Sequence, residues 1–192
     1  MWSLGTVGAG SYGDVGSSIG RAGGMDVSDE VLTGERADLL AALRRHRGFL
    51  RQTVAGLDDE QAARRSTVSA LCLGGIVKHV AITERMWARF AVGGAEAMSS
   101  EPVDWAGQFR MDPTDTLAGL LAEFDRVAAG TDALVATLDL DAAHALPDQP
   151  WFERGAAWTV RRVLLHLVAE IAQHAGHADI IRESIDGAKT MG

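Results

Sequence analysis

Apolar side chains recur at helical spacing along most of the chain. Four amphipathic segments are predicted, over about residues 33–55, 71–91, 112–138 and 159–184. In each of them, large apolar residues return every three or four positions, which places them on one face of an α-helix. No stretch alternates between apolar and polar residues as a half-buried strand does. The pattern therefore predicts an all-α protein.

Four helices that each carry one apolar stripe can bury those stripes only against one another, so a four-helix bundle is expected. The clearest members of the stripes are Leu39, Leu43, Leu50, Ile76, Val80, Phe90, Leu117, Phe124, Leu164, Leu167 and Ile171. The connections of about 15 to 20 residues permit a crossover topology and leave loops free to line a pocket. For the aromatic side chains in these loops, such as Trp105 and Trp151, sealing one end of the core is favoured over ligand contact.

The first part of the chain follows no such pattern. Residues 1–27 are rich in glycine, poor in large apolar side chains and without periodicity. Such a segment buries too little apolar surface to offset its ordering entropy, so we expect a disordered tail. Residues 28–192 are expected to form the single bundle domain.

Composition narrows the function classes. The chain has 18 basic and 26 acidic residues, a formal net charge of −8. This balance repels phosphate backbones, so no nucleic-acid partner is expected. Apolar runs stay shorter than a membrane span requires, and the first residues lack the basic and apolar regions of an export signal, so we expect a cytoplasmic protein without membrane contact.

Cys72 is the only cysteine of the chain and lies in an apolar stretch. An intramolecular disulfide and a thiolate metal cluster are therefore excluded, and Cys72 is interpreted as a small buried apolar residue. Any metal ion must be held by histidine and carboxylate side chains.

The strongest chemical signal is a pair of polar residues at the edge of the last apolar stripe. Glu170 and His174 lie one helical turn apart, a spacing at which two side chains can converge on one cation. His79 faces inward on the second predicted helix and is the candidate third ligand. Three protein ligands leave a position open, as in catalytic metal sites. The alternatives are a hydrogen-bonded core histidine at position 79 and an ordinary surface pair at positions 170 and 174.

Two further histidines, His166 and His177, fall within the same arc of the last helix as this pair. Imidazoles beside a metal site can accept and donate protons near neutral pH. They are candidates for proton transfer.

Two stretches, LGGIVKHVAITE and EIAQHAGHADIIRE, resemble the actinobacterial mini-circle protein branch of the DinB superfamily, which is related to mycothiol-dependent maleylpyruvate isomerase and thiol S-transferases. The resemblance covers about residues 30–190. It implies an up-down-down-up four-helix bundle with a divalent metal, zinc ahead of nickel. It also implies that His79, Glu170 and His174 are the ligands, and it makes a ligand role for His177 less favoured.

The resemblance also implies an enzyme that uses mycothiol or a similar low-molecular-weight thiol as co-substrate on small electrophiles, as an S-transferase or isomerase. Two alternatives stay open. One is a metal-dependent hydrolase or biosynthetic tailoring enzyme that uses metal-bound water. The other is a non-catalytic metal-stabilised bundle, and a homodimer is compatible with either.

Overall fold

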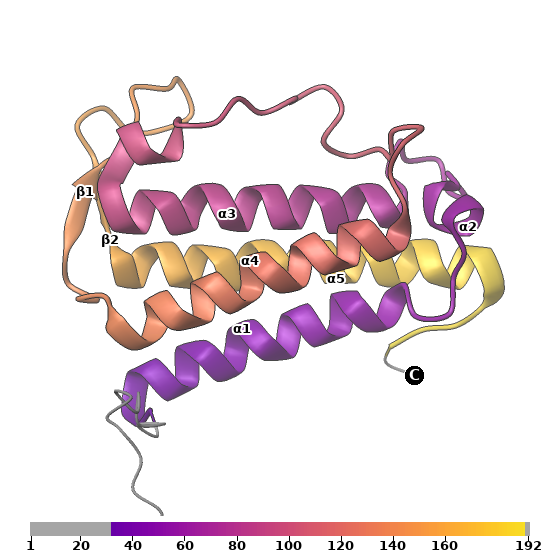
Figure 1. Ribbon diagram of the computed structural model, residues 1–192, viewed down its shortest axis with the longest axis horizontal. Coiled ribbons are helices and arrows are strands. Elements are labelled where there is room, and N and C mark those ends of the chain that lie inside the picture. The colour runs from indigo at the N-terminus through magenta and orange to yellow at the C-terminus, as the bar shows by residue number, and fades with distance from the viewer. Residues whose placement is uncertain (1–31, 191–192) are drawn as a thin grey trace, which may run out of the picture. The chain divides into compact units, whose positions relative to one another are not determined.

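The computed structural model describes residues 32–190, and they form a bundle of helices (Figure 1). The expected tail, residues 1–27, lies outside the described residues. Four long helices confirm the predicted all-α bundle. In chain order the elements are α1 (Gly34–Thr53), α2 (Asp59–Ala63), α3 (Leu73–Met98), α4 (Leu117–Thr137), β1 (Ala143–Ala145), β2 (Ala157–Thr159) and α5 (Val160–Asp186).

The helices run up, down, down and up, because α1 and α5 point one way while α3 and α4 point the other (Figure 1). Ion pairs at the helix starts agree with this arrangement. Arg161 at the start of α5 donates to Glu35 at the start of α1, and Lys78 near the start of α3 donates to Asp115 just before α4. A long connection, residues 99–116, runs back along the bundle and joins the end of α3 to the start of α4 (Figure 1).

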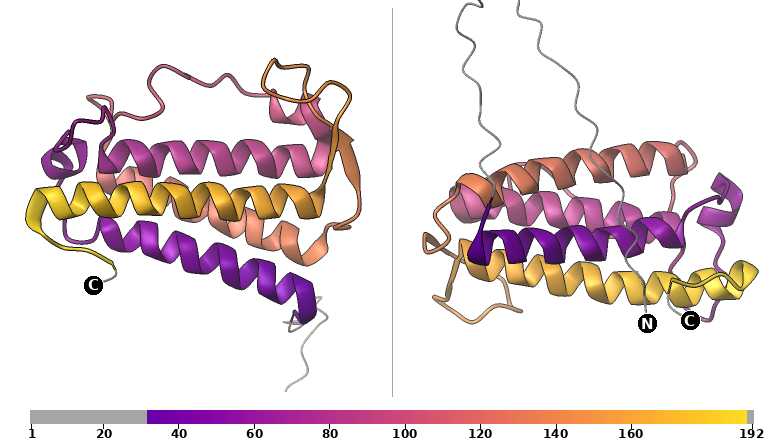
Figure 2. Two further views of the ribbon diagram at one scale, coloured as in Figure 1. Left: turned by 180° about the vertical axis from the view of Figure 1, so that it is seen from behind. Right: turned by 90° about the horizontal axis from the view of Figure 1, so that it is seen from below.

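The predicted apolar stripes form the core. Helix α1 packs against α5, and α3 packs against both α4 and α5 (Figure 2). Leu43, Leu50, Phe90, Leu167 and Ile171 are fully buried. Each such side chain contributes about 1.5–3 kcal/mol through its removal from water. Within the described residues, no helix combines the length and the hydropathy of a membrane span.

Two helix limits differ from the sequence-based expectation. Helix α4 begins at Leu117 rather than at residue 112, and the Thr116 hydroxyl caps it by accepting from the backbone N–H of Gly119. Helix α3 extends to Met98, beyond residue 91, with a kink at Gly93 and Gly94. Gly94 has a φ of 72°, a conformation that glycine adopts without strain.

A short antiparallel hairpin, β1 with β2, was not predicted. Its register pairs His144 with Trp158. Strands of three residues are too short to show an alternating pattern, which is why the sequence did not reveal them. Trp158 stacks on Trp87 of α3 with a ring-centroid distance of 4.8 Å, so the hairpin covers one end of the bundle.

A buried ion pair joins three helices. The Arg47 guanidinium on α1 donates to the Glu84 carboxylate on α3 and, with Nη1 at 2.6 Å from Oδ1, to Asp132 on α4. Glu84 is 0% exposed and Arg47 is 5% exposed. Because a lone buried charge is strongly unfavourable, this pair fixes how α1 and α3 sit against each other.

Candidate metal centre and adjoining pocket

Three of the side chains singled out in the sequence meet at one point between α3 and α5. Nε2 of His79 and Nε2 of His174 each lie 3.2 Å from Oε1 of Glu170. One ligand atom from each residue lies within 4.8 Å of the others. His79 and His174 are each 8% exposed, and the Glu170 side chain is 22% exposed. The two side chains one turn apart on α5 and the inward-facing histidine on α3 therefore meet, as the sequence predicted.

The electrostatics of this ligand trio, His79, Glu170 and His174, favour a cation. Hydrogen bonding with His174, and then with His79, holds the pKa of the Glu170 carboxyl well below its ordinary value, although its burial acts in the opposite direction. The carboxylate thus stays ionised at neutral pH and attracts positive charge, either protons on the imidazoles or a metal ion.

A hydrogen-bond chain orients His79. The side-chain N–H of Gln108 donates to the Trp105 carbonyl at 3.1 Å, which leaves Oε1 of Gln108 to accept from Nδ1 of His79 at 2.8 Å. When His79 is neutral with its proton on Nδ1, Nε2 does not donate to Glu170, and the lone pair of Nε2 faces the carboxylate instead. A lone pair facing a carboxylate oxygen at 3.2 Å is stabilised when a cation lies between them.

The donor set fits a divalent ion of the zinc type. Around a tetrahedral ion with bonds of about 2.1 Å, ligand atoms lie about 3.4 Å apart, close to the 3.2 Å between Oε1 of Glu170 and each imidazole nitrogen. Two imidazoles and one carboxylate are ligands that zinc and nickel both accept. His79, Glu170 and His174 would hold the ion, and a fourth position would remain.

The crossover connection covers the trio. The Phe109 ring stacks on His79 at a centroid distance of 4.0 Å and lies 5.7 Å from the ring of His174. This approach requires glycine at position 75, where a Cβ would lie 2.0 Å from the Phe109 carbonyl oxygen. Gln108 was not identified from the sequence, and Phe109 was considered only as one of the loop aromatics, because a loop has no periodicity. The paired glycines Gly74 and Gly75 were the one available signal of a close backbone contact.

The two histidines considered for proton transfer occupy different surroundings. The His177 ring lies 5.4 Å from that of His174, and Nδ1 of each is buried without a hydrogen-bond partner among the described residues. The His166 ring instead packs against Trp87 and Trp158, at centroid distances of 4.8 Å and 5.3 Å. Burial lowers the pKa of His166, which keeps its imidazole neutral near pH 7.

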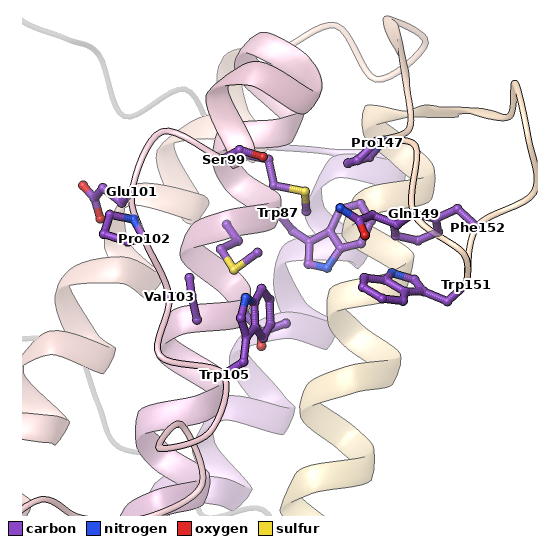
Figure 3. Close-up of a pocket in the computed structure, with 13 residues that line it drawn as sticks. Trp87, Ser99, Glu101, Pro102, Val103, Trp105, Pro147, Gln149, Trp151 and Phe152 are labelled. Carbon is purple, nitrogen blue, oxygen red and sulfur yellow. The ribbon is translucent and has the colours of Figure 1, made fainter.

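A cavity of about 440 Å³ adjoins the trio. Thr83 connects the two, since it lines the cavity and its Oγ1 lies 3.4 Å from Nε2 of His79. Trp87 of α3 and side chains from the crossover and hairpin loops form its walls, among them Trp105, Trp151 and Phe152 (Figure 3). The loop aromatics therefore line a cavity, although a sealing role was favoured over ligand contact from the sequence.

Comparisons with known proteins agree with this fold. The sequence model of the family described as mycothiol-S-transferase matches residues 38–187. A solved structure described as the conserved protein of locus from Enterococcus faecalis is similar, with a TM-score of 0.57 and 13% sequence identity, over 82% of this chain and 100% of that chain. At this identity the likeness shows the fold alone. No curated protein matches the sequence. Since the family match spans most of the residues, and agrees with the resemblance of the two sequence stretches, this chain belongs to the DinB-like mycothiol-S-transferase family.

Proposed function

We propose that the protein is a metal-dependent S-transferase that joins a low-molecular-weight thiol of the mycothiol type to small electrophiles. The observation that carries the proposal is the position of the ligand trio beside the cavity, whose lining residue Thr83 contacts His79. A nucleophile and an electrophile can meet only where such sites adjoin. The family match supports the choice of thiol.

The chain's own thiol does not supply the nucleophile. Cys72, the only cysteine, is 1% exposed, and its S–H donates to the Phe109 carbonyl at 3.8 Å. A thiol must therefore enter as co-substrate.

The residues around the site position the reactants. His79, Glu170 and His174 would hold a divalent ion, and a bound ion lowers the pKa of a thiol brought to it. Gln108 keeps the lone pair of His79 directed inward, and Phe109 limits water at the trio. His166, kept neutral by burial, and His177 stay candidates for accepting the thiol proton.

The proposed reaction balances without a redox partner. The thiol loses its proton, and its sulfur forms a bond to the electrophilic carbon. In a substitution, the bond from that carbon to the leaving group breaks and the leaving group departs with the electron pair. In an addition to a double bond, the neighbouring carbon takes up a proton.

The test combines metal analysis with thiol consumption. Full-chain protein purified without chelator is assayed with mycothiol and N-methylmaleimide, and the conjugate is measured by mass spectrometry. His79→Ala and Glu170→Ala should lose both bound metal and the catalysed rate. His46→Ala, which alters a half-buried histidine on α1 outside the site, should keep both.

Two results would overturn the proposal. One is the absence of catalysed thiol consumption by metal-loaded protein across a broad panel of electrophiles. The other is incorporation of oxygen from isotopically labelled water into product without a thiol, which would indicate a hydrolase.

A further inference from the structure

We infer that the aromatic cavity is the electrophile site and that it selects flat, uncharged, apolar electrophiles, aromatic ones above all. The role of the cavity in catalysis rests on the proposed function, whereas its binding preference can be measured without any reaction. Its position, its lining and its charge each support the inference.

Trp87, which lines the cavity, is held rigidly by its neighbours. Trp87 is 6% exposed and is held by Phe90 at a centroid distance of 5.3 Å and by Trp158, with which it stacks at an interplanar angle of 13°. An indole fixed in this way gives the cavity a preformed apolar surface.

The walls are unusually exposed aromatic side chains. Trp105 comes from the crossover connection and is 60% exposed, and Trp151 comes from the hairpin loop and is 71% exposed. Figure 3 shows both at the cavity, on opposite sides of Trp87 in this view. Large apolar groups exposed together around a hollow mark a binding site, because their hydration is released when a ligand covers them.

The cavity lacks the groups that a charged or sugar-like ligand needs. Glu101 is the one charged side chain among the described residues that line it. Its carboxylate is already paired with Arg89 and lies 3.7 Å from Nε of Arg85. No lining cation is available for an anionic electrophile, and few polar side chains are available for a polyhydroxylated thiol. The apolar reactant is therefore the better occupant.

The cavity also has the right size and outlet. A volume of about 440 Å³ lies within the range that encloses a small organic molecule. Thr83, which contacts His79, lines the cavity one helical turn from Trp87, so a ligand in the cavity would lie near the trio.

The first experiment measures binding alone. Naphthalenemethanol, which is unreactive toward thiols, is titrated by calorimetry into the full-chain protein without thiol. Trp105→Ala and Trp151→Ala should each raise its Kd about 3- to 10-fold, the loss expected for an aromatic contact. Ile180→Ala removes an apolar side chain of α5 that is similarly exposed, at 65%, and lies outside the cavity, so its Kd should equal that of the wild type.

The second experiment measures selectivity in turnover. N-phenylmaleimide and N-methylmaleimide share one reactive group, so their ratio of kcat/KM reports the contribution of the ring. The wild type should prefer the phenyl compound. Both tryptophan variants should lower this preference by raising KM for N-phenylmaleimide, while Ile180→Ala should keep it.

The outcomes separate the two ideas. Unchanged naphthalenemethanol affinity in both tryptophan variants, or a raised KM for mycothiol instead of the electrophile, would overturn the inference and leave the S-transferase proposal standing. If the two tryptophan variants weakened naphthalenemethanol binding while Ile180→Ala did not, and no thiol transfer were detected, the proposed function would be overturned and the apolar site supported. Because Trp151, unlike Trp105, takes no part in the hydrogen bonds that orient His79, its variant controls for an indirect effect through His79.

Discussion

The Gln108 side chain allows a sharp test of the candidate metal centre, because its removal leaves all three ligands in place. Its Oε1 accepts from Nδ1 of His79 at 2.8 Å, inside a region where His79 is 8% exposed. In Gln108→Ala, the metal-bound state must keep the proton on Nδ1 without an acceptor. The metal-free protein can move that proton to Nε2, so the cost falls on the bound state.

The expected loss of zinc affinity in Gln108→Ala follows from two independent considerations. An unpaired buried donor costs about 1–3 kcal/mol, which corresponds to a loss of affinity of about 5- to 150-fold. Removing a partner that orients a metal-binding histidine typically costs about 10- to 100-fold in affinity. We therefore expect zinc to bind about 10- to 100-fold more weakly to Gln108→Ala.

The affinity is measured by competition with a chromophoric chelator, and circular dichroism checks that the helices persist. Gln108→Glu keeps an acceptor for the Nδ1 proton and should bind zinc more tightly than Gln108→Ala. Gln173→Ala, which alters an exposed glutamine on α5, should match the wild type. If a folded Gln108→Ala also matched the wild type, the argument that Gln108 orients His79 for metal binding would be refuted.

Three further predictions concern stability. Glu84→Ala should lower the free energy of unfolding by about 3–5 kcal/mol, because it removes the carboxylate that pairs with a buried arginine. Asp125→Ala removes a half-exposed ion pair and should lower it by at most about 1 kcal/mol. Urea denaturation measures both values. Gly75→Ala should displace the crossover loop and lower both the melting temperature and the zinc affinity. Its control, Gly48→Ala, lies in open space on α1 and should stabilise the protein by about 0.8–1 kcal/mol. An unchanged melting temperature in Gly75→Ala would contradict the close contact with Phe109. Burial lowers the pKa of His166, so the unfolded chain binds a proton at this histidine first as pH falls below about 6.5. The wild type should therefore lose stability relative to His166→Phe between about pH 7.5 and about pH 5.5. If the melting temperatures of the two proteins changed equally with pH, the prediction would be wrong.

Much of the fold and the ligand trio could be predicted, because both depend on the periodicity of a helix. The stripe that contains Leu164, Leu167 and Ile171 identifies the buried face of α5, and the same period places Glu170 and His174 at its edge. His79 has its direction from the apolar residues around it on α3. The angle of a side chain on a regular helix is set by its number alone, so this part of the site is encoded locally.

The remainder depended on contacts between distant segments. Gln108 and Phe109 reach His79 because the crossover loop lies across Gly75, and the sequence of a loop carries no period that states its path. Trp105 and Trp151 meet at one cavity from two different loops for the same reason.

Arg47 and Glu84 show the converse case, since charged residues are expected at the surface, and only the packing of α1 on α3 reveals that each satisfies the other in the core. The sequence thus determined which helix faces turn inward and which candidate metal ligands they carry. The tertiary structure alone decided what surrounds those side chains, because loop paths and buried pairings arise from the packing of whole elements rather than from local spacing.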